Sequence, residues 1–192
     1  MRRVFLIHGW GGSPEEGWRP WLKKELEKGG FEVYAPAMPD AEHPRIFPWL
    51  EILRQAVGTP DESVYFVGHS LGCITILRYL EGLQENQKVG GVVLVAGFSD
   101  MQITVGEDED VQELQSFFQT GLDFAAVRKH CDKFVAIHSD NDPYVGLRYA
   151  DIFREKLGAE IIVEKGKSHF SGDDGINELP SALESILQFT SE

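Results

Sequence analysis

The chain has 192 residues, of which 42% are hydrophobic and 26% charged, as is typical of one globular domain. Its formal net charge is −13, and an acidic surface of this kind repels phosphate backbones and anionic lipids. We therefore expect neither nucleic acid nor a membrane as a partner, while the sequence leaves any protein partner unknown.

The N-terminus and the cysteines also restrict the possibilities. The apolar run VFLI at residues 4–7 is too short for the core of a secretory signal, and no run approaches the roughly 20 apolar residues of a membrane span. We therefore expect a cytoplasmic protein. Cys73 and Cys131 form no CxxC pair, so the sequence predicts neither a zinc site nor a dithiol redox site.

Short apolar runs alternate along the chain with longer amphipathic segments. Runs of the first kind are typical of strands buried on both faces, which we expect at Val4–Ile7, Glu32–Ala35, Val64–Val67, Val92–Val95, Phe134–His138 and Glu160–Val163. Apolar residues at helical spacing predict helices at Trp18–Lys28, Ile46–Val57, Leu71–Leu83, Gly146–Leu157 and Ile176–Phe189. This alternation predicts an α/β fold with a mostly parallel central sheet and helices on both faces, in a single domain spanning residues 1–192.

Residues 97–131 interrupt the alternation. They contain no strand pattern and carry an acidic run at residues 107–110, which we interpret as solvated surface. We expect a short helical excursion here, with residues 98–125 as a candidate small cap-like insertion. Its aromatic residues belong either to the core or to the wall of a pocket: Phe117, Phe118 and Phe124.

The sequence GHSLG at residues 68–72 lies between a predicted strand and a predicted helix. A sharp turn there lifts the side chain of Ser70 above the sheet, and the flanking glycines avoid clashes in the turn. A serine hydroxyl is a weak nucleophile that needs a base within reach. We interpret Ser70 as a catalytic nucleophile; the structural alternative is that it only caps the helix.

The glycine-rich sequence HGWGG at residues 8–12 follows the first predicted strand. In a hydrolase of this architecture, a backbone N–H from this loop and the N–H after the serine stabilise the oxyanion. These donors would come from Trp10, with Gly9 as second choice, and from Leu71. The alternative is a connection without a role, and His8 is interpreted as a structural histidine.

Two later strands are followed by candidates for the acid and the base. The order Ser70, Asp142, His169 is that of a serine–acid–histidine triad in this architecture. Asp140 competes with Asp142, which we favour because Pro143 fixes the turn after it; Asp140 could brace the turn. His169 is favoured by its position over His8, His43, His69, His130 and His138, with His69 expected to point away from Ser70. Asp173 and Asp174 are interpreted as N-terminal charges of the last helix.

Several segments together resemble a known family. They are HGWGGSPEEGWRPWL at 8–22, APAMPDAEHP at 35–44, Trp49, VGHSLG at 67–72, NDPYV at 141–145, and SHF with GINELPSALE within 168–184. The chain is similar over nearly its whole length to the small α/β-hydrolase serine hydrolases grouped with the bacterial protein YdeN and the mammalian retinoblastoma-binding serine hydrolase. It departs from their pattern at Lys167 and in the length of residues 98–125.

This resemblance implies a compact α/β-hydrolase fold with little or no cap, and a catalytic Ser70, Asp142 and His169. It implies hydrolysis of carboxylic esters or related acyl compounds through an acyl-enzyme, with a small-molecule acyl substrate and neither a metal nor an organic cofactor. Trp10, Trp49, Phe117 and Tyr144 are candidates for an apolar acyl pocket, or for ordinary core. The alternative function is a protein-binding module that keeps the fold with little or no turnover.

Overall fold

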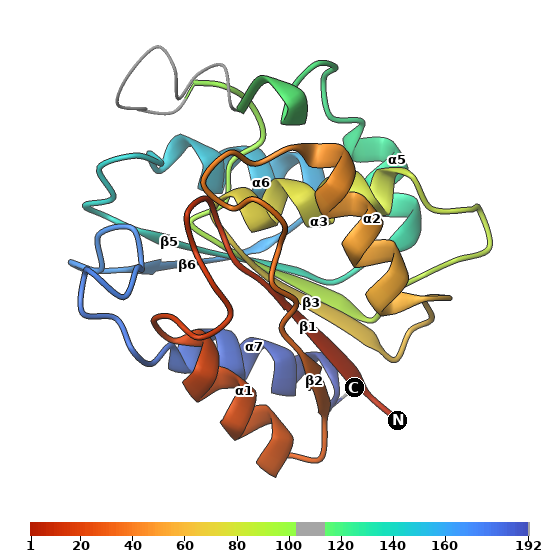
Figure 1. Ribbon diagram of the computed structural model, residues 1–192, viewed down its shortest axis with the longest axis horizontal. Coiled ribbons are helices and arrows are strands. Elements are labelled where there is room, and N and C mark those ends of the chain that lie inside the picture. The colour runs from red at the N-terminus through yellow and green to blue at the C-terminus, as the bar shows by residue number, and fades with distance from the viewer. Residues whose placement is uncertain (103–113, 192) are drawn as a thin grey trace.

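The central element of the molecule is an open sheet of six parallel strands. The computed structural model describes residues 1–102 and 114–191, and within them the strand order is β2-β1-β3-β4-β5-β6 (Figure 1). All six predicted strands are present, with ends shifted by at most two residues: β1 Arg3–Ile7, β2 Glu32–Tyr34, β3 Val64–His69, β4 Gly91–Val95, β5 Phe134–Ser139 and β6 Glu160–Glu164. The predicted parallel α/β sheet is therefore confirmed.

Helices cover both faces of the sheet. Helices α1 and α7 lie on one face, and the remaining helices lie on the other (Figure 1). Their bounds are α1 Arg19–Lys28, α2 Ile46–Val57, α3 Leu71–Glu81, α5 Phe124–His130, α6 Arg148–Leu157 and α7 Pro180–Phe189, with a short 3₁₀ turn at Gln115–Phe117. Among the described residues, no helix is long and apolar enough to cross a membrane.

Two helix predictions need correction or completion. The last helix begins at Pro180 and not near Ile176, because proline is favoured in the first turn of a helix, where its missing N–H costs nothing. Asp173 and Asp174 therefore do not lie at its N-terminus. Helix α5 falls inside the expected helical excursion, and the side chain of Asp123 caps it by accepting from the N–H groups of Ala125 and Ala126.

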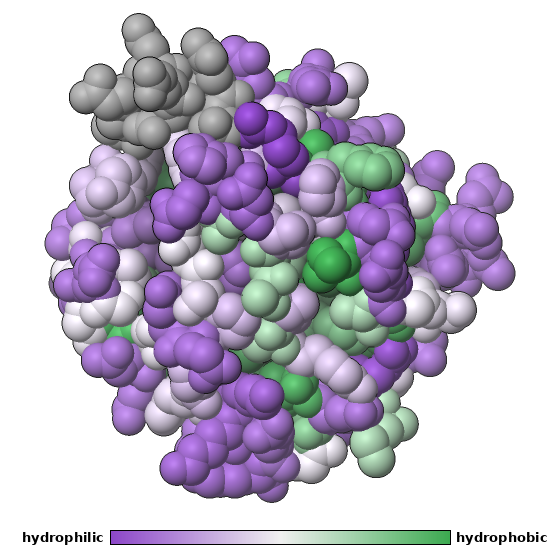
Figure 2. Space-filling model, viewed as in Figure 1, coloured by the Kyte–Doolittle hydropathy of each residue, from purple (hydrophilic) through white to green (hydrophobic). Residues whose placement is uncertain are grey.

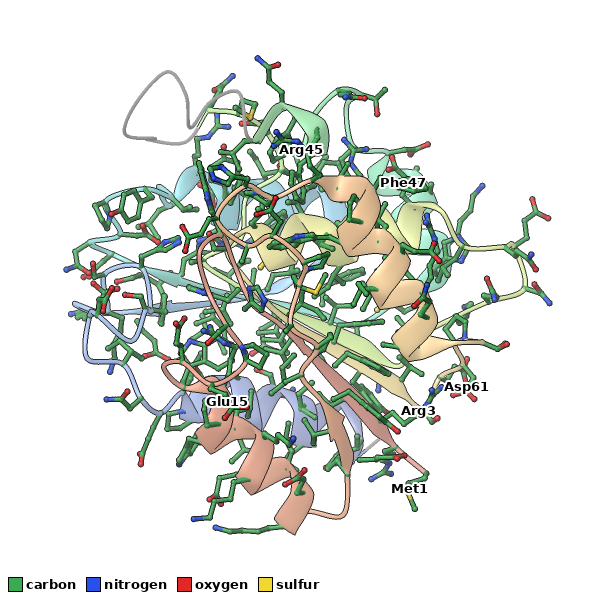
Figure 3. The ribbon with its side chains drawn as sticks, in the orientation of Figure 1. Met1, Arg3, Glu15, Arg45, Phe47 and Asp61 are labelled. Atoms are coloured by element: carbon green, nitrogen blue, oxygen red, sulfur yellow. The ribbon has the colours of Figure 1, made fainter. Side chains whose placement is uncertain are left out.

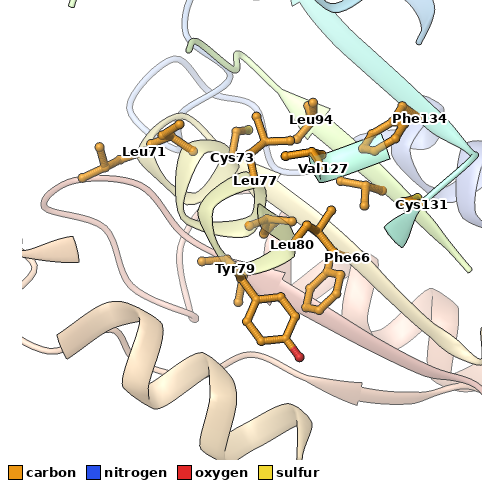
Figure 4. Close-up of a cluster of buried hydrophobic side chains, with 14 of the residues drawn as sticks. Phe66, Leu71, Cys73, Leu77, Tyr79, Leu80, Leu94, Val127, Cys131 and Phe134 are labelled. Atoms are coloured by element: carbon orange, nitrogen blue, oxygen red, sulfur yellow. The ribbon is translucent and has the colours of Figure 1, made fainter. Parts of the chain in front are cut away.

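Two apolar cores fill the space between the sheet and its helical layers. The larger core includes α3 and the strand residues that face it, and Figure 4 shows part of this cluster, with Leu77 of α3 and Phe66 of β3 among its side chains. Both cysteines lie in it. Burial raises the pKa of Cys131 to about 12 and also raises the pKa of Cys73, so neither thiol is activated.

The segment expected to be cap-like is described in part. Its acidic run and the rest of residues 103–113 lie outside the described residues. Phe117 is buried against Trp49, and Phe118 packs against Phe98. Phe117 therefore belongs to the larger core, and Phe118 and Phe124 are partly buried and pack against it.

The face of the molecule shown in Figure 2 is largely hydrophilic, with small apolar patches between charged side chains. One exposed apolar residue is Phe47 at the start of α2, which is 71% exposed and projects outward in Figure 3. Single exposed apolar side chains of this kind are common on protein surfaces.

Candidate active site

Ser70 stands in a strained turn between β3 and α3. Its φ of 52° and ψ of −117° are unusual for a residue with a side chain, and such strain is often found at functional sites. The N–H of Ser70 donates to Val95 O at 2.9 Å, and its carbonyl accepts from the N–H of Cys73 at 2.9 Å. The turn is therefore fixed from both sides, and it presents the hydroxyl at the carboxyl end of the sheet.

The two flanking glycines are required by close backbone contacts. A Cβ at Gly72 would lie 2.3 Å from Ile7 O, and one at Gly68 would lie 2.8 Å from Cys73 N. Neither contact can be relieved by rotating a side chain, because the atoms met belong to the backbone. The predicted role of these glycines in a tight turn is therefore confirmed by the geometry.

The three predicted triad side chains are in contact. His169 Nε2 lies 2.9 Å from Ser70 Oγ, and His169 Nδ1 lies 2.8 Å from Asp142 Oδ2. A carboxylate only accepts, so Nδ1 carries the proton and Nε2 is free to accept from the serine hydroxyl. This is the arrangement in which a histidine can act as a base toward a serine.

The two competing aspartates have different partners. Asp142 is nearly buried, with 2% of its side chain exposed, and its Oδ1 accepts from the N–H groups of Tyr144 and Val145. Asp140 Oδ1 instead accepts from the N–H of Gly166 at 2.8 Å, which precedes His169 in the chain. Asp140 therefore braces the loop that carries His169, while Asp142 contacts the imidazole.

Two of the other histidines have surroundings that suit a structural role. His8 donates from Nδ1 to Gly9 O at 2.8 Å and accepts the N–H of Met38 at Nε2. Burial and the nearby charge of Arg19 lower its pKa, which agrees with a neutral structural histidine. His138 is 1% exposed and neither ring nitrogen has a partner among the described residues.

The predicted oxyanion donors lie beside the serine. Gly9 and Trp10 line the same cavity as Ser70, and a Cβ on Gly9 would lie 3.0 Å from Ser70 Cβ. Leu71 is the first residue of α3, so its N–H has no acceptor within the helix. Trp10 is held in place by donating from Nε1 to Glu42 O at 2.9 Å.

The MPD and following EHP sequences form the loop that supports this glycine-rich segment. This loop accepts from Trp10 Nε1 at Glu42 O, and its Met38 N–H donates to His8. In addition, Gly11 N donates to Ala41 O at 2.8 Å, and Trp49 Nε1 donates to Pro39 O at 2.9 Å. Trp49 is therefore a buried support for this loop and not a wall of the cavity, which decides between the two roles proposed for it.

A cavity of about 450 Å³ opens beside Ser70 and His169. Five glycines line it, together with polar or charged side chains, and Trp10 is the one large apolar residue among them. The glycines are Gly9, Gly11, Gly12, Gly17 and Gly172, and the further lining residues are Glu16, Arg19, Glu42, His69, Ser171 and Asp173. Glu16 and Gly17 of this lining belong to the loop before α1, which Figure 3 marks with the label of Glu15. Phe117 and Tyr144 are not among the lining residues, although Tyr144 lies edge-on to His169 with ring centroids 5.1 Å apart.

Several contacts of the site are missed from the sequence. His69 is expected only to point away from Ser70, and the structure places its Nε2 2.7 Å from His169 O. Trp18 Nε1 donates to Phe170 O, and Asp174 Oδ2 accepts the N–H of His169. The contacts of His69 and Trp18 join segments far apart in the sequence, whereas Asp174 belongs to the same loop as His169, whose irregular backbone gives no pattern.

Arg19 is a further missed residue, and it lies buried at the cavity wall. Its Nε donates to Ser13 O at 2.8 Å, and its guanidinium lies 3.6 Å from Glu16. Burial lowers its pKa, and Glu16 partly opposes that effect. Across the described part of the chain, no group of three or more histidine, cysteine or acidic side chains is arranged to hold a metal ion.

Comparison with known proteins agrees with this fold and gives the family. A profile of the family described as serine hydrolase matches residues 4–188, and the chain belongs to this family. It is 31% identical over 191 residues to YdeN of Bacillus subtilis (strain 168), covering all of this chain and 97% of YdeN. It is also 24% identical to the serine hydrolase RBBP9 of Rattus norvegicus, over 96% of this chain and 95% of the relative.

Solved structures confirm the α/β-hydrolase fold. The crystal structure of the ydeN gene product from B. subtilis superposes with a TM-score of 0.91 at 31% identity, covering the whole of both chains. Est1E from Butyrivibrio proteoclasticus has a TM-score of 0.74 at 14% identity, over 100% of this chain and 89% of Est1E. The second similarity concerns the fold alone.

Proposed function

We propose that this serine hydrolase cleaves small carboxylic esters through a triad of Ser70, His169 and Asp142 and an acyl-enzyme intermediate. The observation that carries the proposal is the continuous chain of contacts from Ser70 Oγ to His169 Nε2 at 2.9 Å and from His169 Nδ1 to Asp142 at 2.8 Å. A buried carboxylate in this position fixes the imidazole tautomer and stabilises the imidazolium that forms during the reaction.

In the first half of the reaction, Ser70 Oγ attacks the ester carbonyl carbon while His169 Nε2 takes the hydroxyl proton. The carbonyl oxygen becomes negatively charged and accepts from the N–H of Leu71 and from that of Trp10 or Gly9. The bond to the leaving alkoxide then breaks as the imidazolium returns the proton to that oxygen. The alcohol leaves, and the acyl group remains on Ser70.

In the second half, water attacks the acyl carbon and gives a proton to His169. The bond to Ser70 Oγ breaks, the imidazolium protonates Oγ, and the carboxylic acid is released. His169 thus takes part in every proton transfer of this cycle. Each oxyanion donor in such a site is worth about 10²–10³ in kcat.

The side chains that line the cavity support a short acyl group. Trp10 is the one large apolar side chain among them, whereas binding of a long acyl chain depends on burying CH₂ groups at about 0.8 kcal/mol each. We therefore expect kcat/KM to fall from p-nitrophenyl acetate through butyrate to laurate. A preference for laurate would contradict this part of the proposal.

The test of the reaction itself is labelling with a fluorophosphonate, followed by mass spectrometry of the adduct. We expect one adduct on Ser70 in the native protein, and none in Ser70→Ala or His169→Ala. Ser63→Ala is the matched control, because Ser63 is bonded to Asp61 and is not among the residues that line the cavity. No adduct on folded native protein would overturn the proposal and favour the protein-binding module.

A further inference from the structure

The loop that carries His169 has a backbone that needs outside support. Ser168 has a φ of 49°, and Phe170 has a φ of 58°. Both residues that flank His169 therefore lie in the left-handed region, which is unfavourable for residues with a Cβ. Contacts from elsewhere in the fold must hold His169 in the position where it meets Ser70.

His69 supplies such a contact from the residue directly before the serine. Its Nε2 lies 2.7 Å from His169 O, and a carbonyl oxygen only accepts, so Nε2 carries the proton. Burial, together with the charges of His169 and Arg19, holds the pKa of His69 well below its ordinary value. The ring is therefore a neutral donor with a fixed tautomer.

The position of this ring is itself determined by packing. His69 is 7% exposed and lies edge-on to Trp18, with ring centroids 6.0 Å apart. Trp18 is fully buried and donates from Nε1 to Phe170 O at 3.0 Å. Two adjacent aromatic rings thus hold two successive carbonyl groups of the histidine loop.

We infer that His69 is a positioning residue, which holds the backbone of His169 so that its imidazole meets Ser70 Oγ. The inference rests on the proposed function, since a base needs placing only if Ser70 is a nucleophile. Because His69 is the last residue of β3 and Ser70 follows it directly, the serine and the loop of its base share one support. A displacement of about 1 Å in such an arrangement can cost about 10²-fold in rate.

The experiment compares His69→Phe, which keeps an aromatic ring but has no donor, with His69→Gln, whose amide can donate over a similar reach. With p-nitrophenyl acetate we expect kcat to fall about 10–100-fold in His69→Phe while KM changes less than about threefold. The kcat of His69→Gln should be at least about tenfold higher than that of His69→Phe. The rate of fluorophosphonate labelling should follow kcat.

The matched control is His130→Phe. His130 is also buried and bonded to a backbone carbonyl, with Nδ1 2.8 Å from Gln87 O, but it lies in α5 and is not among the cavity residues. His130→Phe should lower the free energy of unfolding by about as much as His69→Phe does, and it should leave kcat unchanged. This pair separates a role in placing the base from a general role in folding.

Several outcomes would overturn the inference. They are native kcat in folded His69→Phe, a loss confined to KM, or no recovery in His69→Gln. Should His69→Phe fail to fold, His69→Gln is compared with the shorter His69→Asn, and a kcat ratio near one would contradict the inference. If native protein is not labelled at Ser70, the proposed function fails first; labelled native protein with an unaffected His69→Phe overturns this inference alone.

Discussion

The turn around Ser70 and the loop around His169 are held in place by different interactions. The serine turn is held by backbone hydrogen bonds and is also closely packed, since Gly68 and Gly72 sit where a Cβ would meet backbone atoms. The histidine loop is fixed by hydrogen bonds from side chains. These come from four separate parts of the chain: His69, Trp18, Asp174, and the Ser139–Asn141 segment.

The difference indicates how each half of the site should respond to substitution. A steric position tolerates almost no added volume, because well-packed backbone cannot relax to make room. A position held by several hydrogen bonds loses a limited amount with each bond, about 1 kcal/mol on average. One substitution in the serine turn should therefore cause a large loss of stability and activity, whereas each substitution around the histidine loop should cause a small one.

The largest effect is expected from Gly72→Ala. The added Cβ would lie 2.3 Å from Ile7 O and 2.7 Å from His8 O, which forces α3 away from β1. We expect a loss of more than about 4 kcal/mol in the free energy of unfolding, and loss of activity. Gly82→Ala is the control, because its nearest contact would be an ordinary 3.6 Å. Urea denaturation of both variants measures the difference, and equal stability would contradict the steric account.

The next effect concerns the two aspartates. Asp142→Asn keeps the shape of the side chain but favours the wrong imidazole tautomer, and we expect kcat to fall about 10³–10⁴-fold. In Asp140→Asn the amide oxygen can still accept from Gly166 N, so kcat should stay within about threefold of the native value. Steady-state kinetics on p-nitrophenyl acetate tests the pair. Similar losses in both variants would show that the two roles have been assigned wrongly.

A third effect comes from His138, which is buried by packing with no hydrogen-bond partner among residues 1–102 and 114–191. Burial lowers its pKa from 6.5 to about 4, partly opposed by the charge of Asp142. The unfolded chain then binds a proton near pH 6.5 and the folded protein only near pH 4. Stability should therefore fall as the pH falls through this window, by up to about 3 kcal/mol from this residue.

Urea denaturation at several pH values measures this effect. In His138→Leu the dependence of stability on pH between 6.5 and about 4 should be smaller than in the native protein. An unchanged dependence in His138→Leu would show that other groups cause the acid sensitivity.

The smallest effect is expected from Asp174→Ala. Asp174 is exposed and accepts from the N–H groups of His169 and Ser171 and from the Ser171 hydroxyl. Because water can replace these bonds at the surface, we expect a decrease of only about 1 kcal/mol in the free energy of unfolding and of about tenfold in kcat. Glu178→Ala, an exposed change nearby, is the control. A loss of activity as large as that of Asp142→Asn would contradict the view that each support of the histidine loop contributes only a small part.

The same difference explains what could be predicted from the sequence. The strands and the serine turn follow from local patterns, namely short apolar runs and two glycines at fixed spacing. The contact between His69 and His169 joins residues 100 positions apart, and it depends on how α1 packs beside the sheet. The charged part of the cavity lining escapes prediction for the same reason, since the positions of Glu42 and Asp173 beside the serine depend on how their loops pack in the folded protein.

The two buried cysteines have a practical consequence for reagents. Cys73 lies within the first helical turn after the nucleophile, and its Sγ donates to Val95 O at 3.3 Å in the core. Alkylating agents and mild oxidants react with exposed thiolates, so they should leave the folded protein unmodified. Thiol modification can therefore serve as a probe of unfolding, while hydroxyl-directed reagents report on the site.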